Sequence, residues 1–577
     1  MARTVAKVFI DALEQLGVRQ VFGVVGDALN PLTDAIRRST SITWVSCRHE
    51  EAAAFAASAQ SQLTGELSVC MGTVGPGAVH LLNGLYDAAK SRTPVLAIVG
   101  QVPLVDVGSD YFQEVNNDLL FNDVAEFCAT VTSPEQMPGV LELAVRSAVG
   151  RSGVSVLSIP GDLGDQTVPG DRPTRFSLTR PNARPDDPDV DQAVELLNAS
   201  HRTTLLVGRG ARTSRDDVLL LAEKLRAPMV LTLKAKEGFD GDNPYEVGQT
   251  GLLGNPAAAL AMEQADTLLM LGTDFPYRDW YPKGKTVIQV DTVAEHIGRR
   301  VAVDLGLVGD VGPTVRALLK HLSHKEDSRH LSHARNRYDS WRSGQKRLAA
   351  ADYEHHAVGE VRSALDNRHH LIRPEALAAA VDEVAADDAV FTSDTGMSTV
   401  WLARFVRMHS SRRLVGSFNL GSMANAMPQA IGAQFTYPDR QVVAFCGDGG
   451  LSMLLGDLIT ISTHRLPVKL VVFDNKRLGM VKLEQEQAGI PEFGTELHNP
   501  DFAAVAEALG IPGIRVTAPA DVRDAVKRAF ATEGPVLLDV LTNPDEISVP
   551  ARATVQQGWG YAIAKVKELL QSPGEEI

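Results

Sequence analysis

The sequence predicts three doubly wound α/β domains, each built on a parallel sheet. Short runs of Val, Ile and Leu alternate with longer amphipathic stretches, which is the pattern of buried parallel strands separated by helices. Most of these runs end in Gly, Pro, Asp or Asn, residues that commonly terminate strands. Two polar stretches interrupt the pattern, at 166–190, which holds five prolines, and at 320–370. We therefore expect three domains and a C-terminal segment, at 1–170, 186–325, 365–545 and 546–577.

The strand candidates are distributed evenly over the three domains. The first and third domains have similar sizes, and each carries a Gly-rich turn after an early or central strand. We expect these two domains to share one architecture, although no internal repeat is visible in the sequence. The clearest candidates are 67–72, 94–100, 154–160, 203–208, 267–272, 286–291, 441–447, 468–474 and 534–540.

Length and composition narrow the class of protein. A chain of 577 residues is long enough for about three to five domains. A hydrophobic content of 44% and a charged content of 22% exclude wholesale disorder. The net charge of −15 argues against a nucleic-acid partner held by phosphate contacts. The four widely spaced cysteines predict reduced thiols in a cytoplasmic protein.

Two features of the termini bear on membranes. Residues 1–18 alternate at helical spacing, which predicts neither a signal peptide nor a membrane span. Residues 558–570 can form an amphipathic helix, which would either close the fold or touch lipid. We expect membrane contact to be at most peripheral, at the inner face of the cell membrane, because the acidic chain would be repelled by anionic lipid.

The most informative motif is Gly447-Asp448-Gly449, which closes one predicted strand. Asn475 closes the next strand, and the segment from Gly447 to Asn475 spans 29 residues, about one helix and one strand. Because the carboxyl ends of parallel strands meet at one edge of a sheet, Asp448 and Asn475 should lie close together there. A carboxylate, an amide oxygen and backbone carbonyls suit Mg²⁺, and the following helix N-terminus favours a diphosphate. The triplet alone could be an ordinary turn, so its spacing to Asn475 carries the prediction.

This spacing resembles the thiamine diphosphate (ThDP) fingerprint, although the usual Asn-Asn ending is here Asp474-Asn475. The resemblance implies that Asp448, Asn475 and the backbone carbonyl of Arg477 hold Mg²⁺. Glu50, before the run AAAFAA, matches the catalytic glutamate of these enzymes, whose carboxyl hydrogen-bonds N1′ of the aminopyrimidine. Without the other motifs, Glu50 would be interpreted as an ordinary glutamate in the first turn of a helix, where the helix dipole stabilises its charge.

A second segment, 416–434, resembles the region of these enzymes that bends the cofactor into a V shape. Met423 would be the apolar wedge, flanked by Gly421 and Ser422. Taken alone, Met423 would be ordinary core packing. The neighbouring position departs from the family pattern: this chain has Leu420 where histidine is common in the family.

Over nearly its full length the chain resembles the family of pyruvate dehydrogenase (quinone) and pyruvate oxidase. The resemblance implies oxidative decarboxylation of pyruvate, or a similar small 2-oxo acid, to acetate and CO₂, with electrons passed through FAD to a quinone or another acceptor. It implies a substrate pocket containing Phe112, Gln113 and Glu484, with Met480 where a well-known relative has an aromatic residue. The matching stretches are 25–32, 48–57, 75–87, 111–114, 243–254, 271–282, 416–430, 447–458 and 493–511.

The middle domain is where the resemblance implies FAD. Read from physical chemistry alone, Asp291 is a strand-end acid that could accept a ribose hydroxyl, and Gly208-Arg209-Gly210 is only a partial dinucleotide turn. The residues that match FAD-binding relatives are Thr250, Gly251, Leu252, Leu253, Asp274, Phe275, Pro276, Tyr277, Arg278 and Asp291.

The resemblance also implies a homodimer or homotetramer in which Glu50 and Asp448 of different chains serve one cofactor. Three alternatives stay open: an acetolactate synthase-like carboligase, a phosphate-dependent pyruvate oxidase, and a catalytically silent homologue acting as a binding module. Intact Glu50, Asp448 and Asn475 argue against the last of these.

Overall fold

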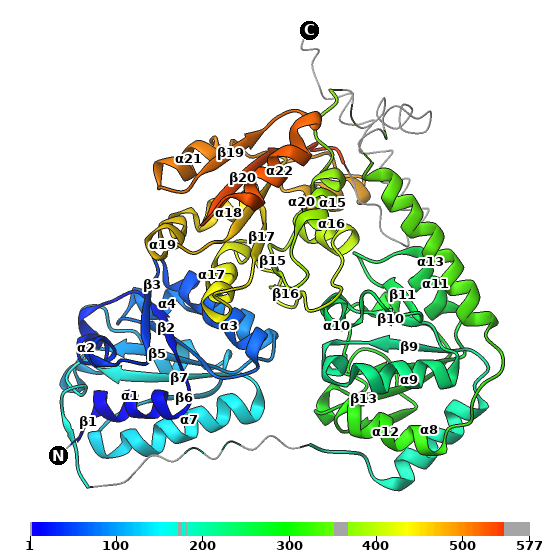
Figure 1. The fold of residues 1–577 in the computed structure, drawn as a ribbon. Coiled ribbons are helices and arrows are strands. Elements are labelled where there is room, and N and C mark those ends of the chain that lie inside the picture. The colour runs from blue at the N-terminus through cyan, green and yellow to red at the C-terminus, as the bar shows by residue number, and fades with distance from the viewer. Residues whose placement is uncertain are drawn as a thin grey trace.

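The computed structural model describes residues 3–170, 182–350 and 369–546, together with positions 176, 178, 353 and 367. Three six-stranded sheets organise these residues, and every strand pair within them is parallel. A separate antiparallel pair joins β1 (Arg3–Thr4) to β8 (Thr167–Val168). The prediction of three parallel-sheet α/β domains is therefore confirmed (Figure 1).

The N-terminal sheet has the strand order β3-β2-β4-β5-β7-β6. Its central strands are buried along their whole length, which explains their continuous apolar sequences. The strands are β2 (Gln20–Gly23), β3 (Thr43–Ser46), β4 (Ser68–Gly72), β5 (Val95–Gln101), β6 (Ala125–Thr130) and β7 (Val154–Pro160). The helices are α1 (Val5–Gln15), α2 (Asn30–Arg38), α3 (Glu50–Thr64), α4 (Pro76–His80), α5 (Leu82–Lys90), α6 (Asn117–Leu120) and α7 (Met137–Arg151).

The middle sheet has the order β11-β10-β9-β12-β13-β14. In chain order this is 3-2-1-4-5-6, the arrangement of the doubly wound dinucleotide-binding fold. The strands are β9 (Thr203–Val207), β10 (Met229–Leu231), β11 (Glu246–Gln249), β12 (Thr267–Leu271), β13 (Thr286–Asp291) and β14 (Leu305–Val308). The helices are α8 (Asp187–Ala199), α9 (Arg215–Leu225), α10 (Lys236–Phe239), α11 (Pro256–Gln264) and α12 (Val311–His321), with 3₁₀ turns that include η4 (Arg209–Ser214), η5 (Leu233–Ala235) and η6 (Arg278–Trp280).

The C-terminal sheet has the order β16-β15-β17-β18-β20-β19. The strands are β15 (Val390–Ser393), β16 (Arg413–Gly416), β17 (Val442–Gly447), β18 (Lys469–Asp474), β19 (Gly513–Val516) and β20 (Val536–Leu541). The helices are α15 (Pro374–Val384), α16 (Met397–Phe405), α17 (Ala426–Thr436), α18 (Asp448–Met453), α19 (Leu458–His464), α20 (Gly479–Gln487), α21 (Phe502–Ala508) and α22 (Val522–Ala531).

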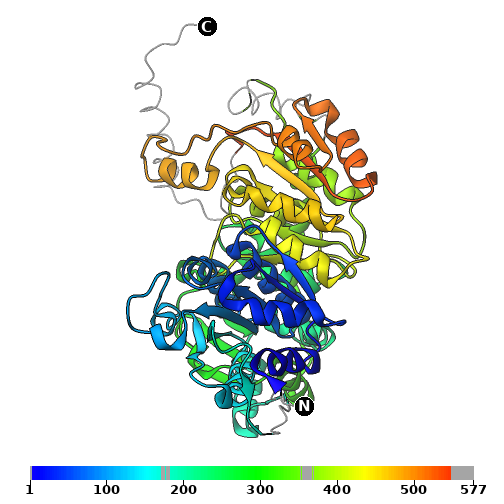
Figure 2. The same ribbon diagram turned by 90° about the vertical axis from the view of Figure 1, so that its left-hand side faces the viewer.

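The first and third sheets share one topology, as expected from the sequence. In chain order both read 2-1-3-4-6-5, whereas the middle sheet differs. The two related domains pack against each other through α3 and α17, and their buried side chains form one continuous core (Figures 1 and 2). Gly432 permits this contact, because a Cβ there would lie 2.1 Å from the carbonyl oxygen of Ala56.

The polar stretch at 320–370 contains a long helix, α13 (Arg329–Leu348), between the middle and C-terminal domains (Figure 1). Along the described chain, no helix combines the length and the apolar character that crossing a bilayer requires. The predicted amphipathic segment 558–570, like nearly all of 546–577, lies outside the described residues.

Candidate active site

Glu50, the predicted catalytic glutamate, is the first residue of helix α3. The preceding residue, His49, caps the helix by accepting the backbone N–H of Glu51 at its Nδ1, 3.1 Å away. Glu50 is 8% exposed, so its carboxyl is largely withdrawn from water. One carboxyl oxygen, Oε2, lies 3.0 Å from Nδ1 of His80. In the part of the chain that the structure describes, Oε1 makes no hydrogen bond, which leaves it available to another group.

His80 is a functional candidate that the sequence analysis missed. It ends the short helix α4, and its ring stacks on His49 with centroids 4.5 Å apart. Among the described residues, His49, Glu50 and His80 form the one group of three His, Cys, Asp or Glu side chains whose possible ligand atoms all lie within 4.8 Å of one another. The available signal was a histidine at the end of the GPGAVH turn, but its partner could not be read without the fold.

Gln113 and Phe112 lie in the loop before α6, beside the same turn. Gln113 has a positive φ of 65°, and its backbone packs on Gly75, where a Cβ would come within 2.8 Å of the Gln113 carbonyl oxygen. Gly77 of this turn lies next to the Glu50 carboxyl, since a Cβ there would be 3.2 Å from Oε1. The structure therefore brings Gln113 to the turn that borders Glu50. Phe112 is 80% exposed in the single chain.

Asp448 and Asn475 occupy the carboxyl ends of the neighbouring strands β17 and β18, as the spacing predicts. Oδ1 of Asp448 accepts the Gly449 N–H at 2.8 Å, and its Oδ2 accepts the Lys476 N–H at 2.7 Å. Asn499, which the sequence analysis did not single out, donates to both Asp448 and Asp474, at 2.8 and 2.7 Å. These bonds hold the two carboxylates side by side at the sheet edge.

This edge carries uncompensated negative charge. Burial, reinforced by the nearby Asp474, raises the pKa of Asp448 to about 7. Across the described ranges, no Lys, Arg or His side chain forms an ion pair with Asp448 or Asp474. One oxygen of Asp474, Oδ2, is buried without a hydrogen-bond partner. Two carboxylates and the Asn475 amide oxygen, which also accepts the Arg477 N–H at 3.0 Å, form a donor set that fits a hard divalent cation.

The predicted wedge segment lies against this edge. A Cβ at Gly449 would be 3.0 Å from the terminal methyl carbon of Met423, so the methionine packs directly on this glycine. Gly421 has a φ of 83°, in the left-handed region that favours glycine. The hydroxyl of Ser422 accepts a hydrogen bond from Asn83 of the N-terminal domain at 2.9 Å. The segment is thereby tied to both related domains.

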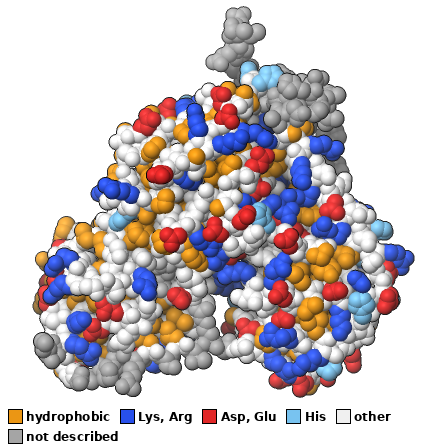
Figure 3. All heavy atoms as spheres, in the orientation of Figure 1, with side chains coloured by type: hydrophobic (Ala, Val, Ile, Leu, Met, Phe, Trp, Pro, Cys, Tyr) orange, Lys and Arg blue, Asp and Glu red, His pale blue; other side chains and the backbone are white. Residues whose placement is uncertain are grey.

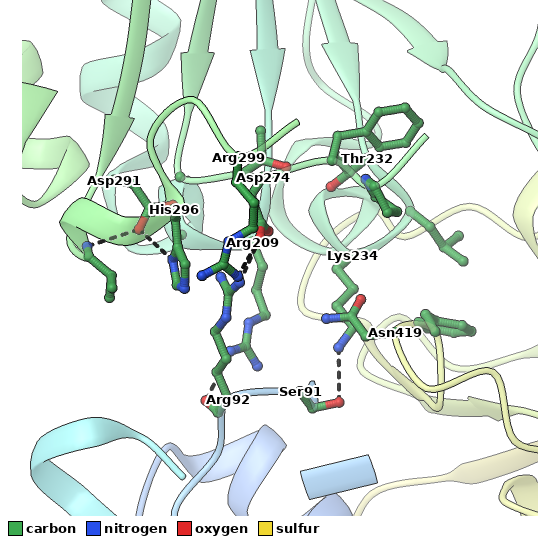
Figure 4. A pocket seen from close by; sticks show the side chains of 18 of the residues that line it. Ser91, Arg92, Arg209, Thr232, Lys234, Asp274, Asp291, His296, Arg299 and Asn419 are labelled. Carbon is green, nitrogen blue, oxygen red and sulfur yellow. Dashed lines mark hydrogen bonds and ion pairs between the residues drawn. The ribbon is translucent and has the colours of Figure 1, made fainter. Parts of the chain in front are cut away.

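A large cavity of about 1270 Å³ lies where the three domains meet (Figure 4). It opens at the switch point of the middle sheet, between β9 and β12, where ligands bind in doubly wound folds. The turns after these strands touch backbone to backbone, since a Cβ at Gly208 would lie 2.4 Å from the Gly272 carbonyl oxygen. Of the predicted residues, those lining the cavity are Thr250, Leu252, Leu253, Asp274, Phe275, Pro276, Tyr277, Asp291, Met480 and Glu484.

Two predicted FAD residues are not part of this lining. Gly251 packs against Phe275, which does line the cavity, and a Cβ at Gly251 would be 2.8 Å from the Phe275 ring. Its φ of 91° lies in the left-handed region that favours glycine. Arg278 lies in η6, where its guanidinium points to the carbonyl of Arg299 at 3.4 Å. Arg278 is thus not itself in the lining, but it contacts Arg299, which is.

Glu484 and Met480 are on α20, at the C-terminal-domain wall of the large cavity. The negative charge of Glu484 contributes, after burial, to a raised pKa of Tyr277 in the middle domain. Within one chain, the structure groups Glu484 with the cavity, whereas Glu50 and Gln113 border the GPG turn. The four predicted catalytic residues therefore fall into two places.

Basic side chains that the sequence analysis missed surround the cavity (Figure 4). Lys234 donates to the Ser91 hydroxyl at 3.1 Å, and Arg209 donates to the carbonyl of Arg92 at 3.2 Å. Burial, with repulsion from Arg209, lowers the pKa of Lys234 to about 7. Burial, with repulsion from Arg212 and Arg92, lowers the pKa of Arg209 to about 10. These cations face a cavity that would accept an anionic ligand.

Two acidic groups of the cavity already have side-chain partners. Arg92 bonds Asp274 at 2.8 Å, and His296 lies 3.1 Å from Oδ1 of Asp291. Asp291 also accepts the N–H of Val293 at 3.0 Å, so it is held at the end of β13 as the sequence predicts. Among the described residues, Arg209 and Lys234 form no ion pair with a carboxylate, so their charges face the cavity without a partner.

Comparison with known proteins matches all three domains to one family. Residues 3–120, 190–318 and 394–540 match the N-terminal TPP binding domain, the central domain and the C-terminal TPP binding domain of thiamine pyrophosphate enzymes. The putative thiamine pyrophosphate-containing protein YdaP of Bacillus subtilis is 36% identical over 100% of this chain and 98% of its own length. The chain belongs to the thiamine pyrophosphate enzyme family.

Other relatives of this ThDP-dependent enzyme differ in activity. Pyruvate oxidase of Lactiplantibacillus plantarum is 31% identical over 93% of this chain and 88% of its own length. Acetolactate synthase of Mycobacterium bovis is 32% identical over 94% of this chain and 88% of its own length. The family implies ThDP, with Mg²⁺ as its usual partner, and the uncompensated carboxylates at Asp448 and Asp474 fit that cation.

Proposed function

We propose that this protein oxidatively decarboxylates pyruvate, or a similar small 2-oxo acid, to acetate and CO₂. In this proposal the electrons pass through FAD to a quinone or another acceptor. The observation that carries it is the 1270 Å³ cavity, which runs from the switch point of the middle sheet to α20 of the C-terminal domain. Such a cavity would let a dinucleotide in the middle domain reach the ThDP-binding domain.

The residues of the cavity support a dinucleotide ligand. Arg209 and Lys234 would hold the diphosphate, because they are the cations without a carboxylate partner at this cavity. Asp291 would accept a ribose hydroxyl, since its position is fixed by His296 and Val293. Met480 and Glu484 would border the other end of the ligand.

The ThDP end of the reaction is assigned to residues on both related domains. Asp448 and Asn475, with the carbonyl of Arg477, would hold the metal that binds the diphosphate of ThDP. Glu50 would hold and release a proton at its Oε1, because His80 occupies Oε2. When bound, ThDP supplies the electron sink for CO₂ release and FAD supplies a two-electron acceptor.

We further propose that the working unit is a homodimer, or a homotetramer built from such dimers. Large apolar side chains are exposed on both related domains of the single chain, among them Val105 (87%) and Phe112 (80%) of the N-terminal domain and Met453 (62%) and Phe493 (84%) of the C-terminal domain. Exposed apolar groups of this size favour burial against a partner surface. Phe112 would join the substrate pocket from such a surface.

Anaerobic mixing with pyruvate tests the proposed reaction. We expect the bound flavin to bleach and acetate to appear in equal amount. An oxidised flavin with acetolactate as product would instead establish the carboligase activity named for one group of relatives. Acetyl phosphate formed only with added phosphate would establish a phosphate-dependent oxidase. Absence of bound flavin after reconstitution would contradict the FAD assignment itself.

A further inference from the structure

A second cavity, of about 570 Å³, lies where the middle domain, helix α13 and the C-terminal domain meet. Among the residues that the structure describes, it shares no lining residue with the large cavity, and it includes none of the residues assigned to ThDP or the metal. Its walls are the turn 241–244 with Glu246, one face of α13, and Arg407 just beyond α16. Figure 3 shows Lys and Arg side chains gathered on the face where the middle domain and the C-terminal domain adjoin.

The floor of this cavity is a neutral ion network. Asp240 pairs with Lys236 and, at 2.8 Å, with Arg407. Glu246 lies 3.8 Å from Arg407 and accepts the hydroxyl of Tyr338 at 2.8 Å. Two acids and two bases balance one another, and the network joins residues of all three walls. The floor is therefore fixed and has no spare charge of its own.

The α13 wall carries spare positive charge. Arg335, Arg342 and Lys346 line the cavity at spacings of seven and four residues, which place them on one helix face. Arg335 is paired with Asp339 at 3.0 Å. Arg342 donates to the backbone carbonyl of Arg404 at 3.5 Å. No carboxylate of the described chain pairs with Arg342 or Lys346.

The spacing of these two cations is itself unfavourable. Arg342 and Lys346 are four residues apart on one helix, so their like charges repel each other. An anion between them would remove that repulsion and satisfy the guanidinium donors. The hydroxyl of Ser343 lines the same cavity and could accept a hydrogen bond from an uncharged part of the ligand. The lining also includes one exposed acid, Asp242, on the turn opposite α13.

We propose that this cavity binds a phosphate-bearing small molecule, with Arg342 and Lys346 holding the phosphate. A phosphomonoester carries about −1.5 to −2 charges at neutral pH, which matches two unpaired cations. The cavity is larger than a free phosphate needs and within the range of small-molecule sites, about 300–1,000 Å³. Because its walls belong to the middle domain, α13 and the C-terminal domain, the ligand would bridge all three.

Titration calorimetry on the full-length protein, saturated with ThDP, Mg²⁺ and FAD so that the other sites are filled, tests this proposal. The probes are ribose 5-phosphate, inorganic phosphate, and ribose as the uncharged control, at constant ionic strength. We expect both phosphates to bind and ribose to give no heat. Tighter binding of ribose 5-phosphate would identify an organic phosphate as the ligand, and equal binding would identify free phosphate.

Charge-removing variants locate the binding. Arg342→Gln/Lys346→Gln should weaken phosphate binding at least tenfold, and each single variant should give part of that loss. Arg337→Gln is the matched control, because Arg337 is exposed on the same helix, bonds Gln264 at 3.3 Å and lies outside the cavity. A melting temperature close to wild type excludes misfolding. Unchanged affinity in the double variant, or no phosphate binding by wild type at millimolar concentration, would overturn the proposal.

Discussion

The Nδ1 atom of His80 lies 3.0 Å from the Oε2 atom of Glu50, and the two residues come from the helices α4 and α3 that flank strand β4 in the chain. This contact fixes one oxygen of a buried carboxyl and leaves the other oriented toward Gly77. In a ThDP enzyme such a carboxyl must exchange a proton with the cofactor, so its orientation matters as much as its presence.

Replacing the Glu50 carboxyl should therefore separate binding from activation. Glu50→Gln should keep ThDP and Mg²⁺ bound but slow deprotonation at C2 of the cofactor by about 100- to 10,000-fold, because a proton-relay group is lost. Hydrogen–deuterium exchange at C2 measures this rate. Glu51→Gln is the control on the next residue, since the Glu51 carboxyl bonds Asn83 and has no such role in the proposal. Exchange at the wild-type rate in Glu50→Gln would show that Glu50 is not the proton-relay group.

The metal assignment rests on Asp448. Asp448→Ala should weaken Mg²⁺-dependent ThDP binding by at least about a hundredfold, because one direct ligand of the cation is removed. Fluorescence quenching on titration with ThDP, with and without Mg²⁺, measures the affinity. Asp439→Ala removes an exposed carboxylate before the same strand and should leave the affinity unchanged. If Asp448→Ala bound ThDP normally, the GDG motif would have been misread.

Much of this architecture could be predicted from the sequence because strand ends are local signals. Gly447-Asp448-Gly449 and Asn475 follow buried apolar runs, and parallel topology alone brings them to one sheet edge. The roles of His80, Lys234 and Arg209 could not be predicted, because their partners come from other elements or other domains. The helix at 329–348 was missed because its sequence is too polar to show a clear apolar stripe. Arg278 matched its family segment, but a local 3₁₀ turn directs it to Arg299, which lines the cavity, so Arg278 borders the cavity only through that residue.

The lowered pKa of Lys234 makes proposed dinucleotide binding depend on pH. Burial brings this pKa to about 7, so the free protein loses the ammonium charge as pH rises above 7. An anionic ligand favours the charged form and raises the pKa, so binding above pH 7 must take up a proton. We expect the affinity for FAD to fall by up to about tenfold per pH unit above 7.

Calorimetry in two buffers of different ionisation enthalpy measures the proton uptake directly. Lys234→Met should bind FAD more weakly at pH 6.5 and should lose most of the pH dependence between pH 7 and 8.5. Lys224→Met serves as the control, because Lys224 bonds the carbonyl of Leu319 away from the cavity. The same pH dependence in Lys234→Met and wild type would show that another group is responsible.

The last prediction follows from the proposed dimer. In that dimer, Glu50 of one chain and Asp448 of the other chain serve the same cofactor. Each chain of the dimer would then contribute half of two equivalent sites, as in any isologous two-fold assembly. Chains carrying Glu50→Gln alone, or Asp448→Ala alone, should each be nearly inactive. A mixed dimer should hold one site with both substitutions and one site with neither, so mixing and refolding the two variants should restore up to about a quarter of wild-type activity, since half the dimers are mixed and half their sites are intact. Native mass spectrometry gives the fraction of mixed dimers, and pyruvate turnover gives the activity. If both residues of a site came from one chain, no mixture would regain activity, and a fully active monomer in sedimentation would exclude the shared site altogether.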